Sequence, residues 1–223
     1  MSVTKKYDAD YFENGIETGK SCYTNYRWIP ELTVRMAHHL ICYLNLTSGD
    51  RVLDYGCAKG FTVKALRMLD VDAYGCDVSE YAIDNVDADV RHHCKLIKPN
   101  GKVIPFRQKF DWIMSKDVLE HLNERSIDKF LKESLLHTKR AFHVIPLGDG
   151  HGKYIVPDYQ RDVTHVTAED LSWWEAKFAA CGWRVSAFSY NVKGIKDVWT
   201  DRYKRGNGFF TLEKREGART RSK

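Results

Sequence analysis

The sequence predicts an α/β fold in which a mostly parallel sheet carries helices on both faces. Short apolar segments of strand type alternate with amphipathic segments of helical type through the first two thirds of the chain, which is the order expected of such a sheet. The stretch Arg51–Gly60 joins a strand to a helix through a glycine turn. With 223 residues, 43% of them hydrophobic, the chain can bury a substantial core. We expect one domain, residues 1–223.

The glycine turn follows the first predicted strand and is the centre of the prediction. That strand ends at Asp54, and Gly56 and Gly60 bracket the turn. Glycines let backbone N–H groups and a helix N-terminus approach a ligand without an intervening Cβ. A second strand ends about twenty residues later at Asp77, where a carboxylate can hold a pair of ribose hydroxyls. The two strands together indicate a nucleoside ligand.

The other elements follow from apolar spacing and from turn and capping residues. Ser79 is a candidate N-cap. The expected helices are Pro30–Leu44, Phe61–Leu69, Glu80–Val86, Ser126–His137 and Ala168–Cys181, and the expected later strands are Val90–Cys94, Trp112–Ser115, Ala141–Ile145, Trp183–Val192 and Phe209–Lys214.

Three segments lie outside this regular pattern. Residues 1–27 are rich in tyrosine and predict an N-terminal cap, which either closes over the ligand as a lid or packs on the sheet edge. Residues 28–215 form the core and include a long loop, 146–166, at the carboxyl edge of the sheet, where long loops are commonly functional. Residues 216–223 form a basic tail.

The acid in the turn distinguishes between nucleoside ligands. A dinucleotide site favours Gly-x-Gly-x-x-Gly without a carboxylate, because the pyrophosphate is negative. Here Asp54 lies within Asp-x-Gly-x-x-x-Gly, and a carboxylate suits an ammonium group. The pattern Val-Leu-Asp-x-Gly-Cys-x-x-Gly resembles the first motif of the class I S-adenosylmethionine-dependent methyltransferases, with Ala58 at the position where that family usually has a glycine.

A second run, Phe110–Leu122, resembles the corresponding motif of small-molecule methyltransferases, including ubiquinone-type O-methyltransferases. The resemblance implies a Rossmann-like, doubly wound, seven-stranded sheet with an antiparallel last strand, and S-adenosylmethionine as the cofactor. The Pro-Pro-aromatic motif of nucleic-acid amino-methyltransferases is absent from this run. The cofactor-binding residues implied are Asp54, Gly56, Cys57, Gly60, Asp77, Val78, Ser115 and Asp117.

The long loop supplies the main catalytic candidates. Its Asp162-Val163-Thr164-His165 run is similar to a segment of methyltransferases associated with sugars and surface polysaccharides. A histidine oriented by Asp162 would accept the proton of an attacking hydroxyl. In the alternative reading Asp162 and Thr164 stabilise a turn, and His165 packs before a helix that Thr167-x-x-Asp170 caps. His121 is a further catalytic candidate or a residue that fixes its loop. We expect no metal site, since the adjacent His38 and His39 face different sides of a helix.

Charge and cysteine usage limit the partners and the compartment. Lys204–Lys223 holds seven basic and two acidic residues and accounts for the whole net charge of +5, so the remaining 28 basic and 28 acidic residues balance. This distribution speaks against a duplex substrate, although the tail leaves nucleic acid as an alternative partner. No apolar run approaches the roughly 18 to 20 residues of a membrane span. The six cysteines form no Cys-x-x-Cys pair, so we expect reduced thiols and a cytoplasmic protein.

The leading hypothesis is a S-adenosylmethionine-dependent methyltransferase that acts on a hydroxyl of a small molecule or saccharide. One alternative is transfer to nitrogen, or to a nucleic acid through the basic tail. A second is a nonenzymatic S-adenosylmethionine-binding or partner-binding module, for which the altered turn at Ala58-Lys59 is the hint.

Overall fold

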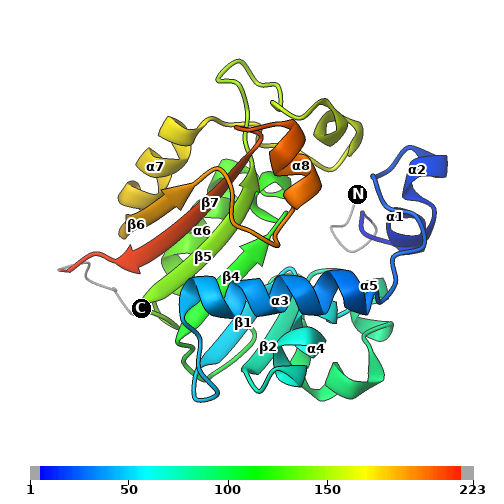
Figure 1. Cartoon of the computed structure of the whole chain (residues 1–223), viewed down its shortest axis with the longest axis vertical. Helices are drawn as coiled ribbons and strands as arrows, with labels where there is room; N and C mark the ends of the chain where they lie inside the picture. Colours follow the sequence, from blue (N-terminus) through cyan, green and yellow to red (C-terminus); the bar gives the residue numbers. More distant parts are fainter. Residues whose placement is uncertain (1–5, 217–223) are drawn as a thin grey trace.

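A computed structural model describes residues 6–216 and contains a seven-stranded sheet in the order β3-β2-β1-β4-β5-β7-β6 (Figure 1). The first five strands are parallel, and β7 runs antiparallel to both β5 and β6. The predicted sheet with its antiparallel last strand is confirmed. The strands are β1 Arg51–Tyr55, β2 Asp72–Asp77, β3 Cys94–Leu96, β4 Trp112–Lys116, β5 Arg140–Pro146, β6 Trp183–Ser189 and β7 Asn207–Lys214.

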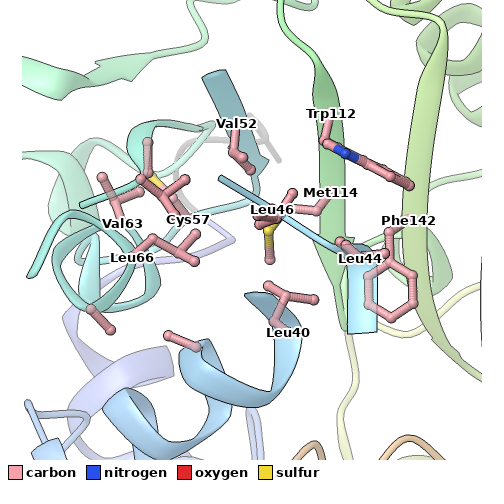
Figure 2. Close-up of a cluster of buried hydrophobic side chains, with 14 of the residues drawn as sticks. Leu40, Leu44, Leu46, Val52, Cys57, Val63, Leu66, Trp112, Met114 and Phe142 are labelled. Atoms are coloured by element: carbon pink, nitrogen blue, oxygen red, sulfur yellow. The ribbon is translucent and has the colours of Figure 1, made fainter. Parts of the chain in front are cut away.

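Helices cover both faces of the sheet because alternate strand residues point to opposite sides. Val52 packs with one cluster of apolar side chains, to which α3 and α4 contribute, and Leu53 packs with a second, to which α6 and α7 contribute. Figure 2 shows the first cluster, with Leu40 and Leu66 facing the strands. The longer helices are α3 Pro30–Leu44, α4 Phe61–Met68, α6 Glu124–Ser134 and α7 Leu171–Ala180, and the shorter ones are α1 Ala9–Glu13, α2 Gly15–Thr18, α5 Glu80–Asp84 and α8 Asp197–Arg202.

The described part of the N-terminal segment forms α1 and α2, which lie to one side of the sheet in Figure 1. Tyr11 and Phe12 of α1 pack with Ala82 of α5 in a small apolar cluster of their own. Lys59 of the glycine turn reaches this segment, where its ammonium contacts the Glu13 carboxylate at 2.5 Å and the Tyr26 carbonyl at 2.9 Å. The cap is therefore tied directly to the turn after β1.

Two local predictions are wrong. The expected strand Val90–Cys94 is mostly a 3₁₀ helix, Ala88–His93, because the Asp87 side chain accepts the Asp89 N–H and starts a helical turn. The expected capping box is also absent: Asp170 itself is the N-cap of α7 and accepts the Trp173 N–H at 2.9 Å, while the Thr167 hydroxyl donates to the Leu122 carbonyl.

The other predicted elements are present, with boundaries that move by a few residues. Ser79 caps α5 as predicted and accepts the Ala82 N–H. The connection after β6, which had no predicted structure, contains α8. Of the predicted basic tail, 216–223, all but its first residue lies outside the described residues.

Candidate functional site

A cavity of about 400 Å³ lies where the carboxyl ends of β1, β2 and β4 meet the N-terminal segment. β1 and β4 are neighbours although they are separated in the chain, so this is the point where the strand order reverses and where open α/β sheets bind ligands. Seven of the residues predicted from the sequence line the cavity: Asp54, Gly56, Cys57, Asp77, Val78, Asp117 and His121.

The glycine turn has the backbone shape that its sequence predicts. Gly56 has φ +83°, and a Cβ at this position would lie 2.4 Å from Cγ2 of Val118, so the site requires glycine. Ala58, which replaces a glycine of the similar motifs, also adopts a left-handed conformation with φ +48°. Its N–H donates to Oδ2 of Asp77 at 2.8 Å. This hydrogen bond holds the turn against the end of β2.

Asp77 forms one wall of the cavity and is held by backbone groups on both oxygens. Oδ1 accepts the Ser79 N–H at 2.8 Å, and Oδ2 accepts that of Ala58. Burial raises the pKa of the Asp77 carboxyl, and these hydrogen bonds lower it in part. The carboxylate therefore has a fixed orientation at the cavity.

Asp54, at the end of β1, is a buried acid on the cavity surface, with 5% of the residue exposed. Burial raises the pKa of its carboxyl to about 7, although the nearby Lys116 lowers it. A cationic ligand at this carboxylate would restore its charge.

Two residues predicted to contact the cofactor lie outside the cavity lining. A Cβ at Gly60 would lie 3.1 Å from the Cys94 sulfur and 3.2 Å from Cγ2 of Val90, so Gly60 permits close packing under the turn. The buried Ser115 hydroxyl pairs with Nδ1 of His143 at 2.8 Å in the interior of the sheet. Both residues support the site from behind.

Asp117 follows β4 in a left-handed conformation, with φ +56°. Its carboxylate contacts the ammonium of Lys116 at 2.6 Å and that of Lys196 at 2.5 Å, and the two cations hold its pKa well below the usual range. Lys196 precedes α8, so this ion pair connects the end of β4 to the distant α8 segment. Sequence reasoning missed Lys196, because nothing in its local pattern indicates the contact.

The catalytic candidates form one cluster beside the cavity. The His121 ring lines the cavity and lies 4.5 Å, centroid to centroid, from the His165 ring. Nδ1 of His121 contacts the Thr164 hydroxyl at 2.8 Å, and that hydroxyl donates to Oδ1 of Asp162 at 2.5 Å. The structure thus brings together His121, His165 and Asp162 from two distant segments.

The arrangement within this cluster differs from the predicted one. Nδ1 of His165 lies 2.7 Å from the Tyr159 carbonyl, and Nε2 lies 3.8 Å from Asp162, beyond hydrogen-bonding distance. The prediction that Asp162 orients His165 is therefore wrong. Asp162 instead holds Thr164 and accepts the Tyr11 hydroxyl at 2.9 Å.

Partial burial favours the neutral form of both histidines. It lowers the pKa of His121 to about 3 and lowers that of His165 as well. Glu120 lies beside them, fully buried, and neither of its carboxylate oxygens has a hydrogen-bond partner among the described residues. Burial raises the pKa of Glu120 well above its usual value. The sequence offers Glu120 together with His121, either as a contributor to the site or as a residue that fixes the loop.

The N-terminal segment contributes mainly aromatic side chains to the cavity lining, and its role as a lid stays a prediction. The Ser79 hydroxyl donates to the Tyr7 carbonyl at 2.6 Å, which joins the segment to the end of β2. The residues of the N-terminal segment that line the cavity are Lys6, Tyr7, Tyr11, Phe12, Tyr23 and Tyr26.

Comparisons with known proteins agree with this geometry. A family model of a methyltransferase domain matches residues 52–140. No curated protein sequence matches the chain.

Solved structures share the fold at low sequence identity. A chain from the Haloferax volcanii complex of the Trm112 methyltransferase activator with a methyltransferase has TM-score 0.68 and 14% identity, covering 98% of this chain and 100% of its own. A S-adenosylmethionine-dependent methyltransferase from Clostridium acetobutylicum has TM-score 0.59 and 12% identity, and the match covers 84% of this chain and 92% of that one. The mitomycin 7-O-methyltransferase has TM-score 0.60 and 14% identity, and the match covers 90% of this chain and 65% of that one.

The class I methyltransferase fold is thus confirmed, and the domain matched over residues 52–140 supports a S-adenosylmethionine-dependent methyltransferase. Among residues 6–216, no helix has the length and apolar character needed to cross a membrane.

Proposed function

We propose that this protein transfers the methyl group of S-adenosylmethionine to a hydroxyl of a small molecule or saccharide. The observation that carries the proposal is that one cavity is lined both by the turn after β1 and by His121 of the histidine cluster. The groups that we propose to bind the cofactor and to accept a proton therefore line the same cavity.

The residues present fit the cofactor. The Asp54 carboxylate on the cavity wall suits an ammonium group, and the Asp77 carboxylate suits a pair of ribose hydroxyls. Gly56 lines the cavity without a side chain, so the backbone of the turn can approach the ligand closely. When bound, S-adenosylmethionine supplies a methyl group already activated by the sulfonium charge.

Transfer requires mainly alignment. The acceptor oxygen forms a bond to the methyl carbon while the carbon–sulfur bond breaks, its electron pair returns to sulfur, and S-adenosylhomocysteine leaves as a neutral thioether. The hydroxyl proton must leave as well. The protein contributes by holding both reactants in line and by excluding water under the aromatic cap.

His121 is the proton acceptor best placed for the acceptor hydroxyl. The Thr164 hydroxyl donates a hydrogen bond to Asp162 and therefore accepts one from Nδ1–H of His121. In this tautomer Nε2 of His121 carries a free lone pair. Because the pKa of His121 is about 3, the ring is a weak base on its own. We therefore expect acceptors whose hydroxyl is acidified, either chemically or by the site.

The test is methyl transfer from labelled S-adenosylmethionine to panels of saccharides, phenols and amines, with the product analysed by mass spectrometry. A methyl ether is expected. His121→Ala and His165→Ala should lower turnover without changing affinity for S-adenosylhomocysteine, whereas the exposed His92→Ala should match the parent. An N-methyl product, or equal turnover in both cluster variants, would refute the proposal.

A further inference from the structure

We propose that Glu120, His121 and His165 form a binding site for a divalent transition-metal cation beside the cavity. One carboxylate oxygen of Glu120 and one ring nitrogen of each histidine lie within 4.8 Å of one another. Nε2 of His165 is 3.9 Å from Oε1 of Glu120. Two ligand atoms that each lie about 2.1 Å from one ion are at most ~4.2 Å apart, so this pair already has a usable spacing.

The unpartnered carboxylate of Glu120 is a second observation, independent of the ligand spacing, that points to a cation. The residue is fully buried, and among residues 6–216 neither of its oxygens accepts a hydrogen bond. A buried carboxylate without a partner is costly, whether it is ionised or protonated. A cation between Glu120 and the two histidines would satisfy this group.

The hydrogen bonds around the histidines prepare both rings as ligands. A metal-binding histidine usually donates its other ring N–H to a carbonyl or a carboxylate, which fixes the tautomer and orientation. Nδ1 of His165 has the Tyr159 carbonyl as its partner. Nδ1 of His121 contacts the Thr164 hydroxyl, which in turn donates a hydrogen bond to Asp162. Both Nε2 atoms are therefore left to bind.

Among residues 6–216, the ion pair of Glu120 is with His165 and not with a lysine or arginine. Lys116 and Lys196 both contact Asp117. The ammonium of Lys6 donates to the Thr164 carbonyl at 3.0 Å. Asp162 is already occupied by Tyr11 and Thr164, but Oδ2 lies 3.8 Å from Nε2 of His165 and is close enough to serve as a fourth ligand after a small shift.

Two imidazoles and one carboxylate select the kind of ion. Imidazole suits zinc, copper, iron, cobalt and nickel, whereas all-oxygen sites suit magnesium and calcium. Histidine binds a metal through a neutral ring, and the Nδ1 contacts of both rings fix the tautomer that leaves Nε2 as the ligand atom. We therefore expect cobalt or zinc to bind in preference to magnesium.

The role of the ion rests on the function proposed above. When bound, the ion supplies Lewis acidity that makes an acceptor hydroxyl easier to deprotonate. In that state Nε2 of His121 binds the ion and does not accept the proton, so the ion takes the place of His121 in activating the acceptor hydroxyl, and the proton leaves to solvent. Since His121 lines the cavity, the ion would lie within reach of an acceptor there.

The direct test is a titration of the metal-free, untagged full chain with Co²⁺, followed by visible absorption and calorimetry. One equivalent is expected to bind, with affinity at least tenfold weaker in Glu120→Gln and His165→Gln. His38 and Cys42 on α3 are exposed and lie 3.8 Å apart, so they form a competing surface site. The control His38→Ala should retain the tight equivalent. Equal affinity in the parent and both cluster variants would overturn the proposal.

A second measurement avoids substitution altogether. Zinc added to the parent protein should shift the imidazole nitrogen NMR signals of His121 and His165, while the signal of His143 stays in place. An unchanged spectrum for both cluster rings would also refute the site.

Failure of the metal site and failure of the proposed function give different results. Binding of S-adenosylhomocysteine and methyl transfer that persist in the presence of a chelator would reject the metal and keep the function. Cobalt bound at the cluster without methyl transfer to any hydroxyl would keep the site and reject the function.

Discussion

The Ala58 N–H donates to the Asp77 carboxylate over 2.8 Å, so the turn after β1 is fastened to the end of β2 by the same group that is proposed to hold the ribose. Asp77 therefore fastens the folded turn, and in the proposed complex it binds the ligand as well. Two predictions separate these contributions.

Replacement of Asp77 by Ala should weaken binding of S-adenosylhomocysteine by about 1–3 kcal/mol, because both the ribose contacts and the anchor of the turn are lost. Isothermal titration calorimetry measures the change. Asp72→Ala, on the partly exposed start of the same strand, is the matched control and should bind as the parent does. Unchanged affinity in Asp77→Ala would remove this residue from the site.

The turn itself should respond differently at its two left-handed positions. Ala58→Gly relieves a left-handed conformation that costs a non-glycine residue about 1–2 kcal/mol. Glycine also gives the unfolded chain more conformational freedom, which lowers the stability of the folded state by about 0.4–1 kcal/mol. The free energy of unfolding should stay equal or rise slightly. Gly56→Ala should lower it by more than about 1 kcal/mol, since the new Cβ meets Val118. Urea denaturation of the pair provides the comparison, and the reverse order would contradict the described turn.

The cap should depend on the hydrogen bond from Tyr11 to Asp162. Tyr11→Phe removes a donor from a buried carboxylate and should cost about 0.5–1.5 kcal/mol of stability. It should also raise the rate of hydrogen exchange in α1, because this hydrogen bond joins α1 to the long loop 146–166. Tyr43→Phe, on the partly exposed face of α3, serves as the control. Identical exchange in α1 of both variants would show that this hydrogen bond does not hold the cap.

The sheet and the turn were predictable because their signals are local. Apolar runs and the glycines around Asp54 determine β1 and the following helix over a few neighbouring residues. The short edge strand β3 was not predictable, because Asp87 capping competes with strand formation just before it.

The candidate site divides in the same way. Motif residues such as Asp54 and Asp77 lie at the cavity as predicted. Contacts between distant segments escaped prediction. Lys196 pairs with Asp117 although the two residues are 79 positions apart in the chain. Asp162 was expected to orient His165, but its carboxylate accepts hydrogen bonds from Thr164 and Tyr11. Sequence spacing gives the type of residue near a site, but it does not give the partner that each hydrogen bond selects.

The pH dependence of cofactor binding should report on Asp54. Its pKa is raised to about 7 by burial, and only the ionised form pairs with the ammonium of S-adenosylhomocysteine. Affinity should therefore be highest above pH 7 and should fall by up to roughly tenfold for each pH unit below it. Calorimetric titrations from pH 8 to 5.5 measure this slope, and Asp54→Asn should bind weakly with little dependence on pH.

The ligand-free protein should show the opposite trend from the same group. A carboxyl whose pKa is higher in the folded than in the unfolded chain binds more protons when folded, so Asp54 makes the folded state less stable as pH rises from about 4 to 7. Thermal unfolding of the parent and of Asp54→Asn isolates this contribution, since the variant lacks it. A parent protein whose cofactor affinity is flat across this range would place the Asp54 carboxylate away from the ammonium group, and the orientation proposed for the cofactor would then be wrong.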